Sequence, residues 1–183
     1  SIVVDAVNGA GSKALPSMVE ALGCTVHHLY CETDGEFPRG AEPLPHNLID
    51  LCDAVLKNKA DAGFAIDPDA DRLAIVSEAG VPLGEEYTLV LAAEGYMKLK
   101  GTPETFVVNQ STSMALEKTA EKYGYKVVRA SVGEINVVKK MLELKSDFGG
   151  EGNGGIILKE AHLGRDSLVA VTLVLNRMAQ DES

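Results

Sequence analysis

The sequence predicts an α/β protein of two tandem homologous domains, each a mixed β-sheet packed between helices. Short β-branched runs alternate with amphipathic segments of helical spacing, as they do in α/β folds. The order of these segments occurs a second time after roughly 90 residues, a period much longer than that of a solenoid repeat. We therefore predict one domain at 1–84 and a second at 85–183.

The first copy opens with the β run IVVD (2–5) and a turn of small residues, NGAG (8–11). A helix should follow, with Ser12 as its N-cap and Gly23 as its stop. Its predicted apolar face consists of Leu15, Met18, Val19 and Leu22. The next segments are a strand at 25–30, a loop at 34–45 and a second helix over about 46–59. The predicted inward face of that helix consists of Leu48, Leu51, Cys52, Val55 and Leu56.

Two strands, 62–66 and 73–77, complete this copy and enclose an acidic turn. The second copy repeats the plan: FVVN (106–109) matches IVVD, and a β run follows the helix that ends at Gly124 as it does the one that ends at Gly23. The stretch at 61–84 likewise parallels that at 147–164, which puts the turns DPDADR and GEGNGG at equivalent positions. Gene duplication explains this likeness, and the alternative is the general similarity of any two α/β units.

Composition limits the classes of protein to consider. The chain has 183 residues, 45% of them hydrophobic, so it can bury a core. Its net charge of −10 without a Lys/Arg cluster argues against nucleic acid or an anionic membrane as a partner. No apolar run approaches the ~20 residues of a membrane span. Three cysteines without metal-type spacing indicate reduced thiols in a cytoplasmic protein: Cys24, Cys31 and Cys52. Because the chain starts directly with a strand and without an initial Met, we expect a piece of a longer protein.

Three carboxylates occupy every second position of the acidic turn. Asp67, Asp69 and Asp71 repel one another, and Arg72 follows at once. A hard divalent cation bound among them would cancel the repulsion, so the spacing indicates a metal site. The alternative is an acidic turn that only faces water.

Two known types of site fit the acidic turn poorly. In an EF-hand, Arg72 would take the place of the glycine that the sharp turn requires, and both flanks are β-like rather than helical. In a haloacid-dehalogenase-type phosphatase, Asp71 would stand where Thr or Val is usual. No suitable downstream set of Lys and Asp completes that second site.

The combination of DPDADR with a distant GEGNGG resembles the α-D-phosphohexomutase superfamily over nearly the whole chain. Further landmarks of that family are VNGAG (7–11), DGEFP (34–38), Pro43 and Asn47-Leu48 in the first copy, and VGE (132–134) in the second. The resemblance implies domains two and three of a four-domain enzyme. The family's serine loop and its phosphate-binding loop do not occur in this sequence, so the first and fourth domains would be partners, and the chain alone should be inactive.

The resemblance also implies a chemistry. In this family a phosphoserine phosphorylates a hexose phosphate, and a bisphosphate intermediate then returns its other phosphoryl group, which interconverts the 1- and 6-phosphates. Mg²⁺ would be bound by Asp67, Asp69 and Asp71, and Arg72 would be catalytic beside the transferring group. The implied sugar-binding residues of the second copy are Glu151, Gly152, Asn153 and Gly154.

The sequence departs from the best-known members at several of these positions. Asn153 and Gly155 replace a serine and a histidine, Glu134 stands where a histidine is frequent, and Gln110 stands where some members carry lysine. The general acid or base is therefore open: Glu134 is a candidate, and a helix-capping role is its alternative. We expect a phosphoglucosamine, phosphomannose or phosphoglucose mutase. The competing hypothesis is a sugar-phosphate binding module that has lost catalysis.

Overall fold

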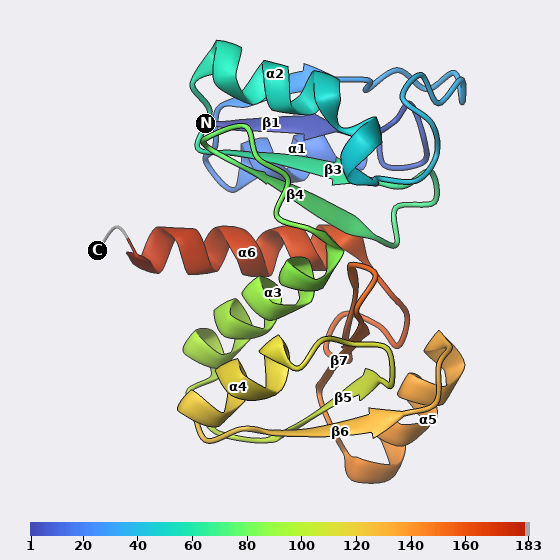
Figure 1. Cartoon of the computed structure of the whole chain (residues 1–183), viewed down its shortest axis with the longest axis vertical. Helices are drawn as coiled ribbons and strands as arrows, with labels where there is room; N and C mark the ends of the chain where they lie inside the picture. Colours follow the sequence, from blue (N-terminus) through green and yellow to red (C-terminus); the bar gives the residue numbers. More distant parts are fainter. Residues whose placement is uncertain (182–183) are drawn as a thin grey trace. The chain divides into compact units, whose positions relative to one another are not determined.

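The computed structural model describes residues 1–181 and divides into two compact units, Ser1–Glu85 and the residues from Glu86 onward (Figure 1). Positions 182 and 183 of the predicted second domain lie outside the described residues. The boundary after residue 84, and the metal and sugar roles predicted for the two domains, stay predictions.

The first domain is a four-stranded mixed sheet of order β2-β1-β3-β4. Its strands are β1 (Ile2–Asp5), β2 (Val26–Leu29), β3 (Ala62–Ile66) and β4 (Leu73–Ser77). β1 runs parallel to β2 and β3, and β4 pairs antiparallel with β3. The helices are α1 (Ala14–Ala21), a 3₁₀ turn (Pro45–Asn47) and α2 (Ile49–Asn58). The predicted bounds of the third and fourth strands are therefore confirmed.

The second domain repeats this topology with the sheet order β6-β5-β7-β8. Its strands are β5 (Thr105–Asn109), β6 (Lys126–Ala130), β7 (Phe148–Glu151) and β8 (Gly155–Leu158). β7 again pairs parallel with the central strand and antiparallel with the last one. The helices are α3 (Glu85–Lys100), α4 (Ala115–Lys122), α5 (Glu134–Leu144) and α6 (Ser167–Asp181). The predicted fold class, two homologous α/β domains with mixed sheets, is confirmed.

Two details of packing reproduce the repeat at the level of single residues. A Cβ on Gly63 of β3 would lie 2.7 Å from Val55 of α2, and a Cβ on Gly149 of β7 would lie 2.5 Å from Met141 of α5. Each glycine therefore lets a helix approach its strand closely. Both helices also end on a lysine in the left-handed conformation, Lys59 with φ 50° and Lys145 with φ 56°.

Some local predictions were wrong. Ser12 does not cap α1, which begins at Ala14; its hydroxyl instead donates to the carbonyl of Gly9 (2.8 Å) and closes the preceding turn. Leu22 and Leu56, assigned to inward faces, are 51% and 53% exposed. Leu22 comes after the last residue of α1, so helical periodicity no longer sets its direction.

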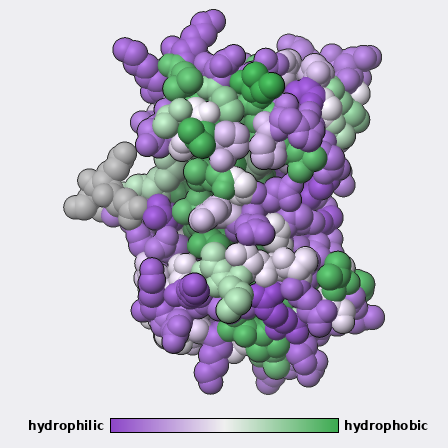
Figure 2. Space-filling view, in the orientation of Figure 1, coloured by the Kyte–Doolittle hydropathy of each residue, from purple (hydrophilic) through white to green (hydrophobic). Residues whose placement is uncertain are grey.

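The surface carries scattered exposed hydrophobic side chains. Figure 2 shows such side chains among hydrophilic ones on the face that carries α2, and α2 exposes Ile49 as well as Leu56. Single exposed hydrophobic residues are normal on protein surfaces. Among the described residues, no helix is long and apolar enough to cross a bilayer.

Candidate functional site

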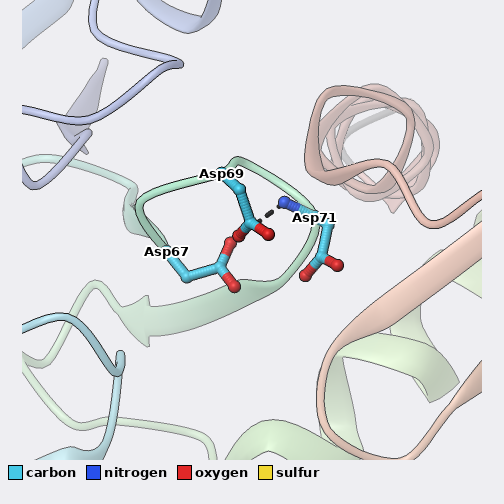
Figure 3. A group of neighbouring side chains, drawn as sticks. All are labelled: Asp67, Asp69 and Asp71. Carbon is cyan, nitrogen blue, oxygen red and sulfur yellow. Dashed lines mark hydrogen bonds between the residues drawn. The ribbon is translucent and has the colours of Figure 1, made fainter.

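The acidic loop, residues 67–72, joins β3 to β4 and brings the three predicted carboxylates together. One oxygen from each of Asp67, Asp69 and Asp71 lies within 4.8 Å of the others. Figure 3 shows the three side chains on this one tight loop. Ala70 takes a left-handed conformation (φ 62°), and its N–H donates to the carbonyl of Asp67 (3.0 Å). This group of carboxylates could hold a metal ion.

Asp67 organises the loop because its buried carboxylate accepts hydrogen bonds from the loop backbone. Oδ1 accepts from the N–H groups of Asp71 and Arg72, each at 3.0 Å, and Oδ2 accepts from Arg72 Nε at 2.6 Å. Burial by itself would raise the pKa of Asp67, but the hydrogen bonds and charge of Arg72 outweigh it and lower that pKa below its usual value. Asp67 is therefore held as a carboxylate that shapes the loop.

Arg72 is anchored on two sides. Besides Asp67, its guanidinium pairs with Glu42, to whose Oε1 its Nη2 donates at 3.0 Å, and Asp71 Oδ1 lies 3.6 Å from its Nε. The hydrogen bond with Glu42 is the main cause of a raised Arg72 pKa, and partial burial acts in the opposite direction. The sequence did not predict Glu42, since only the path of the 34–45 loop brings it to the acidic loop.

A second contact from the same loop is also absent from the sequence prediction. Arg39 donates from Nε to Asp5 Oδ2 (2.5 Å) and from Nη2 to the carbonyl of Ile66 (2.6 Å), directly before Asp67. The side chains of Arg39 and Asp5 are 2% and 0% exposed, so this ion pair is buried. The 34–45 loop thus contacts Ile66, the residue before the acidic loop, through Arg39, and Arg72, the last residue of that loop, through Glu42.

The NGAG turn after β1 also packs against the acidic loop. Ala10 N–H donates to the carbonyl of Pro68 (2.8 Å), and a Cβ on Gly9 would lie 2.6 Å from that same oxygen. Backbone atoms lie on both sides of this contact and cannot turn aside as a flexible side chain can. A glycine at position 9 therefore allows the two loops to touch.

We expect Gly9→Ala to destabilise the first domain by about 1–3 kcal/mol, because the added methyl forces the NGAG turn and the acidic loop apart. Chemical denaturation measures the loss, and Ala10→Gly at the neighbouring exposed position is the matched control. Equal stability of Gly9→Ala and wild type would contradict this close contact.

An open pocket of about 420 Å³ lies beside these loops and is lined by Asn8, Gly9, Ala10, Thr33, Asp34, Gly35, Phe37 and Pro68. Asn8, which lines the pocket, and the preceding Val7 are both left-handed, with φ of 54° and 49°. Such conformations are strained for a β-branched residue and cluster at functional sites. Asn8 stabilises the bend, since its Oδ1 accepts the Glu32 N–H (3.0 Å) and its carbonyl accepts the Gly35 N–H (3.1 Å).

In the second domain, the glycine loop (residues 151–155) centres on Glu151, which is 4% exposed. Glu151 Oε1 accepts from Asn109 Nδ2 (2.9 Å) and from the Gly133 N–H (3.2 Å). Oε2 pairs with Arg165 Nη1 at 3.2 Å. Glu151 therefore links β5, the start of α5 and the segment before α6.

The other predicted residues of the glycine loop shape its backbone. Asn153 Oδ1 accepts the Gly155 N–H (3.2 Å), and Gly154 is left-handed (φ 90°). A Cβ on Gly152 would lie 3.1 Å from Thr112 Cα, so this glycine passes close to another backbone segment. Gly154 therefore supplies a left-handed conformation and Gly152 a close backbone approach, and both features favour glycine.

Glu134 is the first residue of α5, as expected for a helix-terminal carboxylate. Its carboxylate lies beside Arg165, with Oε2 3.2 Å from Nε, and so joins the Glu151 network through that arginine. Gln110 instead lines a separate open pocket of about 330 Å³ with Arg129, Ser131, Asn136, Lys139 and Lys140. The structure thus brings Glu134 to the glycine loop.

The two hairpins correspond less closely than the sequence alignment suggests. In β3–β4 the pair Ala65↔Ala74 encloses residues 66–73, whereas in β7–β8 the corresponding pair Glu151↔Gly155 encloses only 152–154. The central strands β1 and β5 fix this correspondence. Val3 of β1 and Val107 of β5 are equivalent in the repeat, and they pair with Gly63 and Gly149. The residues two positions later, Ala65 and Glu151, are therefore equivalent as well. Glu151 therefore occupies the place of Ala65 rather than that of Asp67.

Comparison with known proteins agrees with this architecture. The family model for phosphoglucomutase/phosphomannomutase, alpha/beta/alpha domain II matches residues 1–80, and that for domain III matches residues 84–183. The chain belongs to the phosphoglucomutase/phosphomannomutase family. The sequence-based resemblance to the phosphohexomutases is confirmed, as is the prediction that the chain corresponds to their second and third domains.

Curated members of the phosphoglucomutase/phosphomannomutase family match nearly the whole chain. A phosphoglucomutase/phosphomannomutase of Thermococcus kodakarensis is 36% identical over 98% of this chain and 39% of its own length. A probable phosphoglucosamine mutase of Methanopyrus kandleri is 35% identical over 98% of this chain and 40% of its own length. The chain therefore spans about two fifths of these relatives.

A solved structure gives the same result for the fold. The crystal structure of a putative phosphomannomutase from Thermus thermophilus superposes with a TM-score of 0.89 at 26% identity, over 100% of this chain and 42% of that one. The two α/β domains of this chain are thus the phosphoglucomutase/phosphomannomutase pair II and III.

Proposed function

We propose that this chain is the metal-binding and sugar-binding part of a phosphohexomutase, which interconverts the 1- and 6-phosphates of a hexose. The phosphoryl donor would be a phosphoserine on another domain of the same protein, and the intermediate a hexose bisphosphate. The observation that carries the proposal is the acidic loop: three carboxylates converge within 4.8 Å beside an anchored arginine, in a member of this family.

The acidic loop fits Mg²⁺ by its chemistry. Its donors are carboxylate oxygens, the hard ligands that Mg²⁺ prefers, and the described part of the loop offers no softer nitrogen or sulfur donor. Asp67, Asp69 and Asp71 would hold the ion and leave positions for a phosphoryl oxygen. When bound, Mg²⁺ would neutralise charge on the transferring phosphoryl group.

Arg72 would contact the same phosphoryl group. Asp67 fixes the Nε side of its guanidinium, so the rest of the planar fork points to a defined place. Glu42 now pairs with the remaining nitrogens, and an incoming phosphoryl group would displace it. Preorganised donors of this kind stabilise charge without reorganisation during the reaction.

The glycine loop would bind the sugar. Glu151 and Asn153 carry oxygens that accept hydrogen bonds from hydroxyl groups, and Gly152 and Gly154 keep the backbone accessible. Glu134 would be the proton carrier; its carboxylate lies near this loop because it shares Arg165 with Glu151. The names of the relatives favour glucose, mannose and glucosamine phosphates as the substrate class.

The test uses the full-length protein that contains this chain, incubated with Mg²⁺ and with the 1-phosphate of glucose, mannose or glucosamine. Phosphorus NMR should show conversion of at least one of them into the 6-phosphate. Binding of these compounds without any interconversion would contradict the proposal and favour a binding module.

A separate prediction concerns the metal alone. Mg²⁺ should raise the unfolding midpoint of this chain, because a ligand that binds only the folded state stabilises it by about 2.7 kcal/mol at a hundredfold excess over Kd. In Asp69→Asn this stabilisation should largely disappear, while Asp53→Asn on the exposed side of α2 keeps it. An unfolding midpoint independent of Mg²⁺ in wild type would contradict a metal site in the acidic loop.

A further inference from the structure

Arg165 connects two carboxylates of the second domain, those of Glu134 and Glu151. It lies between β8 and α6, where an isolated bridge pairs it with Ile157 of β8. Its Nη1 donates to Glu151 Oε2 and its Nε to Glu134 Oε2, both at 3.2 Å. Its backbone N–H also points to Glu134 Oε1, at 3.4 Å. One arginine thus joins the glycine loop to the beginning of α5.

The stem of Arg165 occupies the space above Gly155. A Cβ added to Gly155 would lie 2.4 Å from Arg165 Cδ and 3.0 Å from Cγ, so a side chain at position 155 would have to displace the arginine. The missing side chain at 155 makes room for Arg165, and the carboxylate at 134 gives it a partner. The three residues therefore form one interdependent set.

Arg165 also compensates the charge of Glu151. The Glu151 carboxylate is almost fully buried, and its other hydrogen bonds come from neutral donors, Asn109 and the Gly133 backbone. A buried carboxylate without a cation is unfavourable, and it reorients or takes up a proton when its partner is removed. The planar guanidinium donates to two carboxylates from one side chain. The ammonium of a lysine is a compact point charge and lacks this fork of donors.

We propose that Arg165 is the positioning residue of the sugar site: it holds Glu151 in the orientation that receives the sugar hydroxyls and compensates its buried negative charge. This inference rests on the function proposed above for the glycine loop. Arginine is a permanent cation, so its role is orientation and charge rather than proton transfer.

The first arm of the test needs no activity and uses this chain. In Arg165→Met, hydrogen exchange at the Gly133 amide should become at least about tenfold faster, because the Glu151 carboxylate that accepts its hydrogen bond is no longer held. Arg177→Met is the matched control, since Arg177 is also partly buried and also pairs with a glutamate, Glu94, on α3. The Gly35 amide of the first domain is the internal reference. Unchanged Gly133 exchange in a folded Arg165→Met chain would overturn the positioning role.

The second arm uses the full-length protein and the hexose phosphate it converts. Arg165→Met should raise KM by about 10–100-fold, the effect of one charged hydrogen bond, and change kcat much less, because the sugar is held in ground and transition states alike. Arg165→Lys keeps the positive charge and should therefore fold. Its KM should lie between those of Arg165→Met and wild type. KM values within twofold of wild type in both variants would overturn the inference. A wild-type protein that converts no hexose phosphate would defeat the proposed function instead, and the exchange arm would still decide the role of Arg165.

Discussion

Asp69→Asn is expected to lower the mutase turnover of the full-length protein by about 10²–10³-fold, the usual effect of removing one preorganised electrostatic contact from a reacting centre. Asp69 is exposed, and no hydrogen bond or ion pair of its side chain is found within the described residues. No hydrogen bond of the folded loop depends on its charge, and its removal relieves repulsion among the three carboxylates, so the unfolding midpoint without metal should be no lower than that of wild type. Turnover is measured with saturating hexose phosphate over a range of Mg²⁺ concentrations.

The contrast with its neighbour makes this experiment specific. Asp67→Asn removes the charge that binds Arg72 and weakens the acceptor of two loop N–H groups, so that variant should lose both stability and turnover. Asp53→Asn on α2 should lose neither. Full turnover of Asp69→Asn at low Mg²⁺ would show that the acidic loop does not hold a catalytic metal.

Arg39→Met should destabilise the first domain by about 3–5 kcal/mol at neutral pH, because it leaves the carboxylate of Asp5 buried without its cation. Neither side chain of this pair reaches the surface, in contrast to the exposed pair Lys140–Glu143, which should contribute less than about 1 kcal/mol. The free energy of unfolding from denaturant titration measures both. A loss below about 1 kcal/mol for Arg39→Met would contradict the structural role of the pair.

The same variant should show a defined pH dependence. Burial raises the pKa of Asp5 above its usual value although Arg39 lowers it, and without Arg39 the pKa should rise further. A raised pKa means that the folded state binds the proton more tightly than the unfolded state does. The variant is therefore least destabilised near pH 4, around the usual aspartate pKa of about 3.9, and loses stability as the pH rises.

The double variant Arg39→Met with Asp5→Asn is the control for this pH dependence. It lacks the buried charge, so it should recover part of the stability at neutral pH and lose the pH dependence. A single variant that is equally destabilised at pH 4 and pH 7 would mean that lost packing of Arg39, rather than the charge of Asp5, is responsible.

The sequence by itself determined the elements and the repeat. Short apolar runs on either side of the acidic turn bounded the strands at 62–66 and 73–77. Helical spacing located helices, with a glycine stop at Gly23 and at Gly124, because these signals depend on neighbours only a few residues apart. The aspartates of the acidic loop could also be found, since alternate positions on one short turn are forced close together. Family resemblance then suggested roles for Arg72, Glu134 and the glycine loop, and those roles stay predictions.

Only the tertiary structure decided which groups meet. Arg39 reaches Asp5 across 34 residues, Glu42 reaches Arg72 across 30, and Arg165 reaches Glu134 across 31. No local pattern encodes such pairs, because they depend on the path of loops and on the strand pairing that brings Glu151 beside Asn109. The physical reason is one of range: propensity and periodicity act within a few residues, whereas a buried charge takes its partner from whatever the folded chain places beside it.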